Sequence, residues 1–182
     1  MKFKTETNWC VITGAPSSGK TSVIDELSRR GYKTEPEIAR ELIEECLKHG
    51  EKLEEVRAKS LWLQNEILRL KLNRERAQDP QSLIFLDRGV PDSLTYFRIA
   101  GLDLPAARNA SREFHYRHVF IFDRLSLVAD DVRTESDAIA HQIDLSLEQD
   151  YRYLGYNPIR VPVLPIPKRA DFILQTIEKN KI

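Results

Sequence analysis

The residues at positions 14–21 restrict the possible folds of this chain more than any other stretch does. They read Gly-Ala-Pro-Ser-Ser-Gly-Lys-Thr and fit the pattern G-x-x-x-x-G-K-[ST] of a phosphate-binding loop. The two glycines allow a tight turn, so that successive backbone N–H groups and the start of the next helix point at phosphate oxygens. In such loops the lysine contacts the β- and γ-phosphates and the next hydroxyl binds Mg²⁺. We expect the whole loop to hold a nucleotide, namely Gly14, Ala15, Pro16, Ser17, Ser18, Gly19, Lys20 and Thr21.

The segments on either side have the character that this loop requires. An apolar run at residues 9–13 predicts a short buried strand before it. Residues 21–30 carry apolar side chains at helical spacing, and Gly31 can end a helix there. A strand, a glycine-rich turn and a helix in this order favour a phosphate site over a Gly/Ser loop that binds nothing.

A second buried strand is predicted at residues 82–86, and Asp87 follows it directly. An apolar strand that ends in aspartate resembles the Walker B element, whose carboxylate reaches Mg²⁺ or its water. Many hydrolysing ATPases have a glutamate next, which activates water, whereas this chain has Arg88. The Asp-Arg pair resembles the acid–arginine pair of nucleoside and nucleotide kinases. A helix cap at the end of the strand is the alternative for Asp87.

Two charged residues are expected near the end of another strand. A short strand is predicted at residues 32–34, and Pro36 suits the first turn of the helix that follows. Glu37 and Arg40 then lie in that first turn, at the carboxyl end of a strand, where ligands bind in open α/β sheets. The alternative is that Glu37 only favours the positive end of the helix and that Arg40 only pairs with a carboxylate.

The later part of the chain contains a candidate lid. After a strand at residues 118–122, residues 125–137 are polar and lack a strand pattern, as expected of a segment that closes over a triphosphate. Arg124 and Arg133 flank or lie within it, and guanidinium groups match phosphate with paired donors. Solvated loop arginines are the alternative. Helices are expected at residues 52–77, with charged faces in solvent, and at 103–117, 136–155 and 168–179.

Composition narrows the class of protein. Lys+Arg and Asp+Glu both number 28, and this zero net charge argues against a nucleic-acid partner. The two cysteines and four histidines show no disulfide framework and no metal-binding spacing. No apolar run reaches the roughly 18 residues of a membrane span. We expect residues 1–182 to form a single cytoplasmic nucleotide-binding domain, and no feature identifies a protein partner.

Taken together, the motifs resemble the NadR-like P-loop ATPase/kinase family, which includes ribosylnicotinamide kinase domains with an AAA-type ATP-binding fold. Matching segments span most of the chain, at residues 14–21, 36–40, 87–96, 122–124, 133–135, 151–156, 161–163 and 169–174. The resemblance implies an α/β P-loop NTPase fold of the kinase type. This fold is a three-layer sandwich with a parallel central sheet and helices on both faces.

The resemblance also implies roles for individual residues. The expected catalytic residues are Lys20, Glu37, Asp87, Arg88 and Arg133. Arg124 would join the loop in holding the nucleotide, and Thr21 and Asp87 would hold Mg²⁺. Glu35, followed by Pro36, also resembles the Glu-Pro element of deoxynucleoside kinases, whose glutamate is the general base. Glu35, Glu37 and Asp87 therefore compete for that role.

These features predict an ATP- and Mg²⁺-dependent phosphotransferase that acts on a small, hydroxyl-bearing and nucleoside-like acceptor. The chemistry of this acceptor is not specified further by the sequence. The alternative is a regulatory ATPase or GTPase switch without a small-molecule acceptor. GTP is a possible cofactor, although the chain has no N-K-x-D motif for reading guanine.

Overall fold

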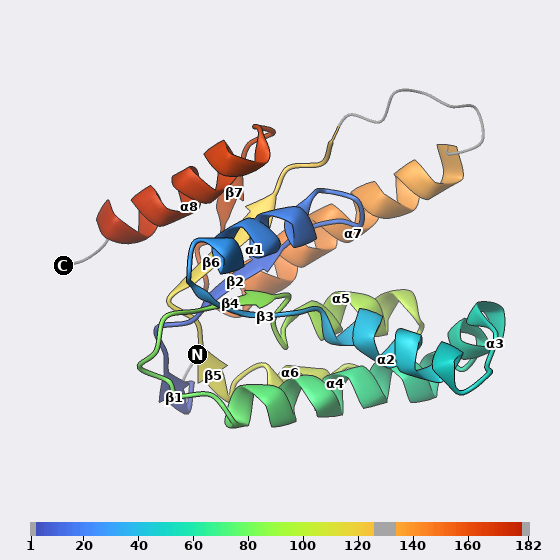
Figure 1. Ribbon diagram of the computed structural model, residues 1–182. Helices are drawn as coiled ribbons and strands as arrows, with labels where there is room; N and C mark the ends of the chain where they lie inside the picture. Colours follow the sequence, from blue (N-terminus) through green and yellow to red (C-terminus); the bar gives the residue numbers. More distant parts are fainter. Residues whose placement is uncertain (1–2, 126–133, 180–182) are drawn as a thin grey trace.

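The computed structural model describes residues 3–125 and 134–179. At its centre, parallel strands form a sheet in the spatial order β3-β4-β2-β6-β7 (Figure 1). These strands are β2 (Cys10–Thr13), β3 (Lys33–Glu35), β4 (Ile84–Asp87), β6 (His118–Phe122) and β7 (Ile159–Val161). Because β2 is the first of these strands in the chain and lies in the middle, later strands lie on both sides of it, β4 and β3 on one side and β6 and β7 on the other. Ligands bind at such a switch point, beyond the carboxyl ends of the strands.

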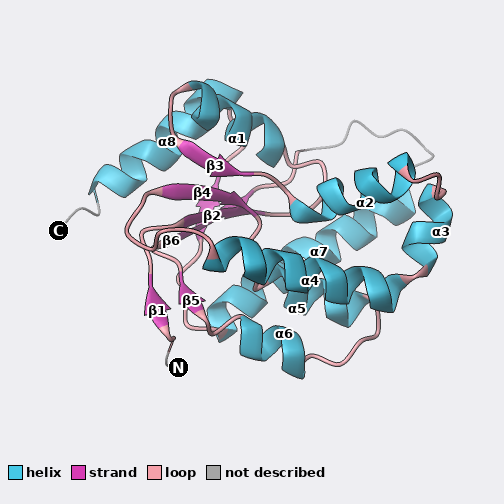
Figure 2. Cartoon of the chain, turned by 60° about the horizontal axis from the view of Figure 1, so that its bottom comes forward, coloured by secondary structure: helices cyan, strands magenta, loops and turns pink. Residues whose placement is uncertain are grey.

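Helices cover both faces of the sheet (Figure 2). One face is packed against α1 (Lys20–Arg29) and α8 (Ile166–Lys179), and the other against α4 (Ser60–Arg76), α5 (Asp92–Ile99) and α7 (Thr134–Tyr153). The remaining helices are α2 (Ile38–Lys48), α3 (Leu53–Ala58) and α6 (Pro105–Ala110). The predicted α/β class, with a parallel sheet between two helical layers, is confirmed.

The apolar runs of the sequence are the buried strands. In β2, Cys10 and Ile12 face the layer of α1 and α8, whereas Val11 faces the opposite layer, and all three are fully buried. Strands covered on both faces need apolar side chains at every position, which explains why the runs do not alternate with polar residues.

Two predictions about the helices are wrong. The helix expected at residues 52–77 is divided into α3 and α4, because Lys59 adopts a non-helical conformation with φ −79° and ψ 42°. The helix expected at 103–117 is only α6, followed by β5 (Phe114–His115), which pairs in parallel with β1 (Thr5–Glu6). Such short strands carry no periodic signal, and β5 is held by the contact of Phe114 with the Trp9 ring, at 4.9 Å between centroids.

Part of the candidate lid at residues 125–137 lies outside the described residues, since 126–133 are not described. The predicted site residue Arg133 belongs to that part. Within the described residues, α7 begins at Thr134, close to the expected position 136. None of the described helices combines the length and the apolar character needed to cross a membrane.

The packing of α8 predicts a clear difference between two isoleucines. Ile173 on α8 is fully buried, whereas Ile139 on α7 is 54% exposed. Ile173→Ala should lower the free energy of unfolding by about 2–5 kcal/mol, because it leaves a cavity. The same change at Ile139 should cost less than about 0.5 kcal/mol. Urea unfolding of both variants measures this, and equal losses would contradict the packing of α8 on the sheet.

Candidate functional site

The phosphate-binding loop connects the carboxyl end of β2 to the start of α1. Gly14 and Gly19 have φ values of 141° and 85°, in the region that disfavours other residues. A Cβ atom on Gly14 would lie 2.9 Å from the backbone oxygen of Phe122 at the end of β6. Both glycines of the motif are therefore required by the backbone itself.

An arginine that the sequence analysis did not single out supports the loop from α8. The guanidinium of Arg169 donates from Nη1 to the backbone oxygen of Ser18 at 2.6 Å and from Nε to that of Pro162 at 3.0 Å. It lies 5.0 Å from the centroid of the Phe122 ring. Arg169 is 2% exposed. Because it lies on α8 and bonds to both Ser18 and Pro162, it connects the loop with α8 and with the residue that follows the last strand.

Lys20 lies inside the hollow of the loop. Its side chain is buried, and Nζ donates to the backbone oxygen of Ala15 at 2.8 Å and to Ser18 Oγ at 3.3 Å. Burial is the larger cause and the nearby charge of Arg88 the second, and together they lower the pKa of Lys20 to about 7. A bound phosphate would replace these partners with a stronger one, because charge-assisted hydrogen bonds exceed neutral ones.

Thr21 and Asp87 meet beside the loop. Asp87 ends β4 and is 3% exposed, and its Oδ2 lies 3.4 Å from Thr21 Oγ1. Its other carboxylate oxygen, Oδ1, is buried without a hydrogen-bond partner among the described residues. Burial raises the pKa of Asp87, and Glu37 adds to the rise. An unpartnered carboxylate oxygen next to a hydroxyl fits Mg²⁺, which binds few protein oxygens and completes its shell with water and phosphate.

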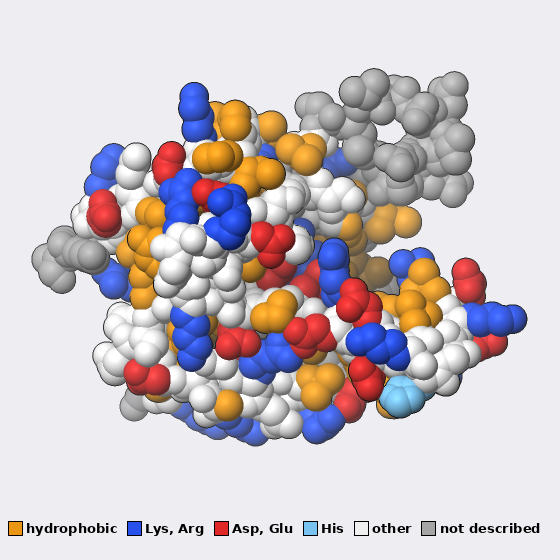
Figure 3. Space-filling view, in the orientation of Figure 1, with side chains coloured by type: hydrophobic (Ala, Val, Ile, Leu, Met, Phe, Trp, Pro, Cys, Tyr) orange, Lys and Arg blue, Asp and Glu red, His pale blue; other side chains and the backbone are white. Residues whose placement is uncertain are grey.

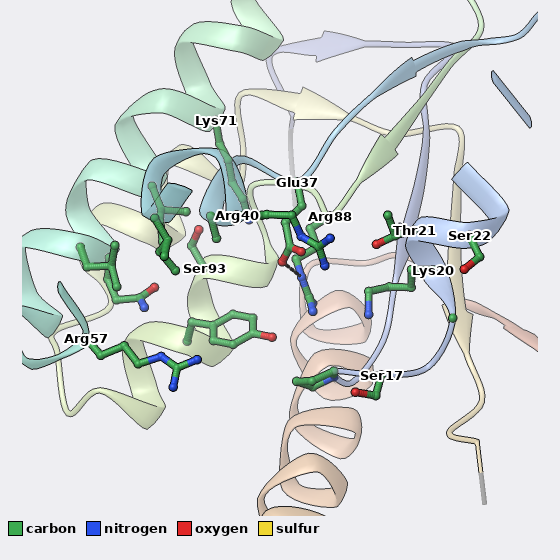
Figure 4. A pocket seen from close by; sticks show the side chains of 18 residues that line it. Ser17, Lys20, Thr21, Ser22, Glu37, Arg40, Arg57, Lys71, Arg88 and Ser93 are labelled. Carbon is green, nitrogen blue, oxygen red and sulfur yellow. Dashed lines mark hydrogen bonds and ion pairs between the residues drawn. The ribbon is translucent and has the colours of Figure 1, made fainter. Parts of the chain in front are cut away.

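Arg88 joins three parts of the site. Its Nε donates to Glu37 Oε1 at 2.8 Å (Figure 4). Its Nη1 donates to the Gly14 backbone oxygen at 3.1 Å and to Asp92 Oδ1 at 3.2 Å. Burial alone would raise the pKa of Glu37, but the guanidinium more than offsets this and the pKa is lowered. Arg88 has a φ of 69°, which is uncommon for a residue with a side chain and marks a strained turn.

Asp92, the first residue of α5, stabilises this turn through hydrogen bonds. It is fully buried and accepts hydrogen bonds from Thr13 Oγ1 at 2.5 Å, Tyr151 Oη at 2.6 Å and the Gly89 backbone N at 3.1 Å. Burial would raise its pKa, but the charges of Lys71 and Arg88 and these hydrogen bonds lower it. Asp92 is thus an ionised anchor for the Arg88 guanidinium.

The three candidate bases occupy different surroundings. Glu35 accepts a hydrogen bond from Gln78 Nε2 at 2.9 Å and lies 3.7 Å from Arg74 Nε, outside the main pocket. Glu37 lines that pocket, and Asp87 lies next to Thr21. The structure therefore brings Glu37 and Asp87 to the loop and leaves Glu35 facing α4.

A pocket of about 570 Å³ extends from the loop to the helices on its other side. Figure 3 shows charged side chains of both signs gathered on this face of the molecule, between α1 and α2. Its apolar wall comes from α2 and α4 and consists of Ala39, Ile43, Leu63 and Ile67. Its polar lining beyond the loop consists of Glu37, Arg40, Arg57, Gln64, Lys71, Arg88, Ser93 and Tyr96. Arg124, just after β6, does not line it.

The prediction that the charged faces of the helix at 52–77 lie in solvent is wrong for two residues. Lys71 and Glu75 are 5% and 4% exposed. Lys71 Nζ donates to the Gly89 backbone oxygen at 3.0 Å, and Glu75 accepts from Tyr116 Oη at 2.9 Å. Burial raises the pKa of Glu75 to about 7. Lys71 and Glu75 follow Ile67 by four and eight residues, so they lie on the same buried face of α4. This spacing is the sequence signal by which their burial could have been predicted.

Comparisons with solved structures show the fold. NadR protein in complex with NR has a TM-score of 0.69 and 16% identity, and the match covers 95% of this chain and 51% of that one. Deoxyadenosine kinase from M. mycoides has a TM-score of 0.61 and 15% identity, over 94% and 99% of the two chains. Thymidylate kinase from Candida albicans has a TM-score of 0.58 and 17% identity, over 96% and 92%.

This chain therefore spans about half the length of NadR, 51% of it, and nearly the full length of the two kinases. No curated protein matches the chain. The likeness to NadR and to nucleoside and nucleotide kinases agrees with the resemblance expected from the motifs.

A family model described as an AAA domain, AAA_28, matches residues 9–169. The match begins just before β2 and ends in α8 at Arg169, so it includes the loop, the Asp87-Arg88 turn and all strands of the central sheet. The predicted relationship to AAA-type P-loop domains is confirmed, and the chain belongs to the AAA_28 family of AAA domains.

Proposed function

We propose that the chain transfers the γ-phosphoryl group of ATP to a hydroxyl group of a small, nucleoside-like acceptor. The observation that carries this proposal is a continuous pocket that runs from the phosphate loop to α2, α3, α4 and α5. Its volume of about 570 Å³ suits a small molecule, for which sites of roughly 300–1,000 Å³ are usual. A hydrolase needs room only for a water molecule beside the γ-phosphate, so a pocket of this size favours a second small molecule as the acceptor. The names of two enzymes with this fold, deoxyadenosine kinase and thymidylate kinase, support a nucleoside-like acceptor.

Nucleotide binding would rest on the loop. Its backbone N–H groups and the start of α1 face the phosphates, and Lys20 supplies a positive charge to the β- and γ-phosphates. Thr21 and Asp87 would hold Mg²⁺, which neutralises phosphate charge when bound. This proposal agrees with the unpartnered Oδ1 of Asp87 beside the Thr21 hydroxyl.

Arg88 would offset the charge that develops on the transferred group. Phosphoryl transfer has a loose transition state, so positioned positive charge contributes more than covalent chemistry does. The guanidinium is already oriented by Glu37, Gly14 and Asp92, and it needs no rearrangement during the reaction. Arg124 and Arg133 remain proposed contacts of the nucleotide.

The acceptor hydroxyl oxygen attacks the γ-phosphorus, the bond to the bridging β–γ oxygen breaks, and ADP leaves. The hydroxyl proton goes to a carboxylate. Our choice for that group is Glu37, since it lines the pocket, whereas Glu35 is bonded to Gln78 outside it. A weak base is sufficient, because the proton is lost late in a loose transition state and orientation dominates.

Substitution of Asp87 tests the proposal together with an acceptor screen. ADP release should depend on an added nucleoside-like acceptor, and Asp87→Asn should lower this rate by about 100-fold or more through lost charge at the metal site. The affinity for an ATP analogue should change much less. Asp25→Asn, at an exposed position of α1 away from the pocket, is the matched control and should keep the full rate.

Slow turnover that no acceptor accelerates would contradict phosphotransfer and favour a nucleotide-dependent switch. Near-normal acceptor-dependent turnover in Asp87→Asn would instead remove Asp87 from the metal site and leave it as a structural cap.

The pKa of Lys20 predicts proton uptake when ATP binds. At pH 8 the ligand-free lysine is mostly neutral, because burial lowers its pKa to about 7. Bound phosphate raises the pKa again, so binding takes up a proton between the two values. Calorimetric titration at pH 8 in buffers of different ionisation enthalpy measures this uptake.

Lys20→Met keeps an apolar chain in the buried position and is the comparison for that titration. It should take up fewer protons than the natural chain at pH 8 and bind the analogue more weakly by about 1.5–3 kcal/mol. At pH 6, where Lys20 is already protonated in the free chain, the difference in uptake should vanish. Equal uptake by the two proteins at pH 8 would exclude Lys20 as the phosphate contact.

A further inference from the structure

We propose that the acceptor is an anion, and that Arg40 and Arg57 bind its phosphomonoester or carboxylate group. This inference rests on the proposed function, since it concerns the second molecule in the same pocket. It begins from the charge of the lining, in which basic side chains outnumber the one acidic side chain, Glu37. The basic side chains are Lys20, Arg40, Arg57, Lys71 and Arg88.

Three of these basic groups already have partners inside the protein. Lys20 donates to the loop, Lys71 donates to the Gly89 backbone oxygen, and Arg88 is paired with two carboxylates. All three are buried, so they are committed to the turn and to the triphosphate. They do not account for the rest of the pocket.

Arg40 on α2 and Arg57 on α3 are different. Both are exposed to the pocket, and neither has a hydrogen bond or an ion pair with another described residue. Exposed arginines elsewhere on the described surface commonly pair with a carboxylate, as Arg69, Arg98 and Arg152 do. Two guanidinium groups on one pocket, without acidic neighbours bonded to them, create a positive potential there.

The positive potential of Arg40 and Arg57 lies on the side of the pocket where the acceptor would bind. Figure 4 shows Arg57 at the side of the pocket opposite Lys20 and Thr21, with Arg40, Glu37 and Arg88 between them. The triphosphate would occupy the loop side. The apolar wall of α2 and α4 can contact a ring or another apolar body, and Arg57 lies beyond the loop on the short helix α3. Guanidinium groups recognise phosphate and carboxylate with paired donors.

The test uses the full chain saturated with Mg²⁺ and a non-hydrolysable ATP analogue, so that ligands meet only the rest of the pocket. Calorimetry compares nucleosides with their 5′-monophosphates and 5′-carboxylates across the common bases. At least one anionic member should bind about tenfold or more tightly than its neutral parent, a difference of about 1.4 kcal/mol. The two anionic series tell a phosphate site from a carboxylate site. Ribosylnicotinamide, whose ring is cationic, should bind more weakly than the anions.

Arg57→Gln should abolish this preference while the affinities for the neutral nucleosides and the ATP analogue stay within about twofold. Arg40→Gln should weaken the anionic ligand in the same direction. Arg69→Gln on α4, whose arginine pairs with Glu66 away from the pocket, is the matched control and should keep the preference.

The inference is overturned if no anion binds more tightly than its parent, or if Arg57→Gln and Arg40→Gln weaken the ATP analogue instead of the anion. Acceptor-dependent ADP release separates it from the proposed function. Neutral nucleosides that accelerate release as well as their anions do would support phosphotransfer and sink the anionic acceptor. Tight, Arg57-dependent anion binding without any acceptor-dependent release would refute phosphotransfer while retaining the anion site.

Discussion

The site depends on the interactions of one buried guanidinium group, that of Arg88, which directly follows β4. Arg88 is 7% exposed and touches the phosphate loop through Gly14, the start of α2 through Glu37 and the start of α5 through Asp92. A buried charge of this kind is tolerated only when paired and hydrogen-bonded, and the loss of one partner costs about 3–5 kcal/mol. The position of the loop relative to the helices is therefore coupled to one side chain.

The strained backbone of Arg88 is held in place by tight packing around Gly89. A Cβ at Gly89 would lie 3.0 Å from Tyr151 Oη and from Val11 Cγ2, so the backbone there lies directly against the core. Lys71 binds the Gly89 carbonyl from α4, and Asp92 binds its N–H. Strain at a functional turn persists when the surrounding structure determines the conformation this fully. The rigidity of the site thus comes from both the sheet and α4.

Local sequence was sufficient to place the loop, Asp87 and Arg88 at the carboxyl ends of buried strands, because this placement requires no knowledge of distant residues. The same reasoning failed for contacts between distant segments. Lys71 was predicted to lie in solvent because its side chain is charged, although its spacing from Ile67 continues the buried face of the helix. Arg169 contacts the loop across a large sequence separation, and no local pattern records that contact. Strands as short as β1 and β5 have no periodicity to detect.

The two sides of the pocket are built on different supports. The loop and the Asp87-Arg88 turn belong to the central sheet and its two packed faces. The opposite side, on α2, α3 and α4, packs around its own cluster of buried side chains, which includes Ile38, Val56 and Leu63. Substitutions in that cluster can change the shape of the pocket while the sheet and the phosphate-binding loop stay intact. The fold that this chain shares with NadR and the two kinases at 15–17% identity therefore does not specify the side chains on that side of the pocket. The proposed acceptor has to be inferred from the side chains of those helices. Their most specific feature is the pair Arg40 and Arg57, which line the pocket and have no ion-pair partner among the described residues.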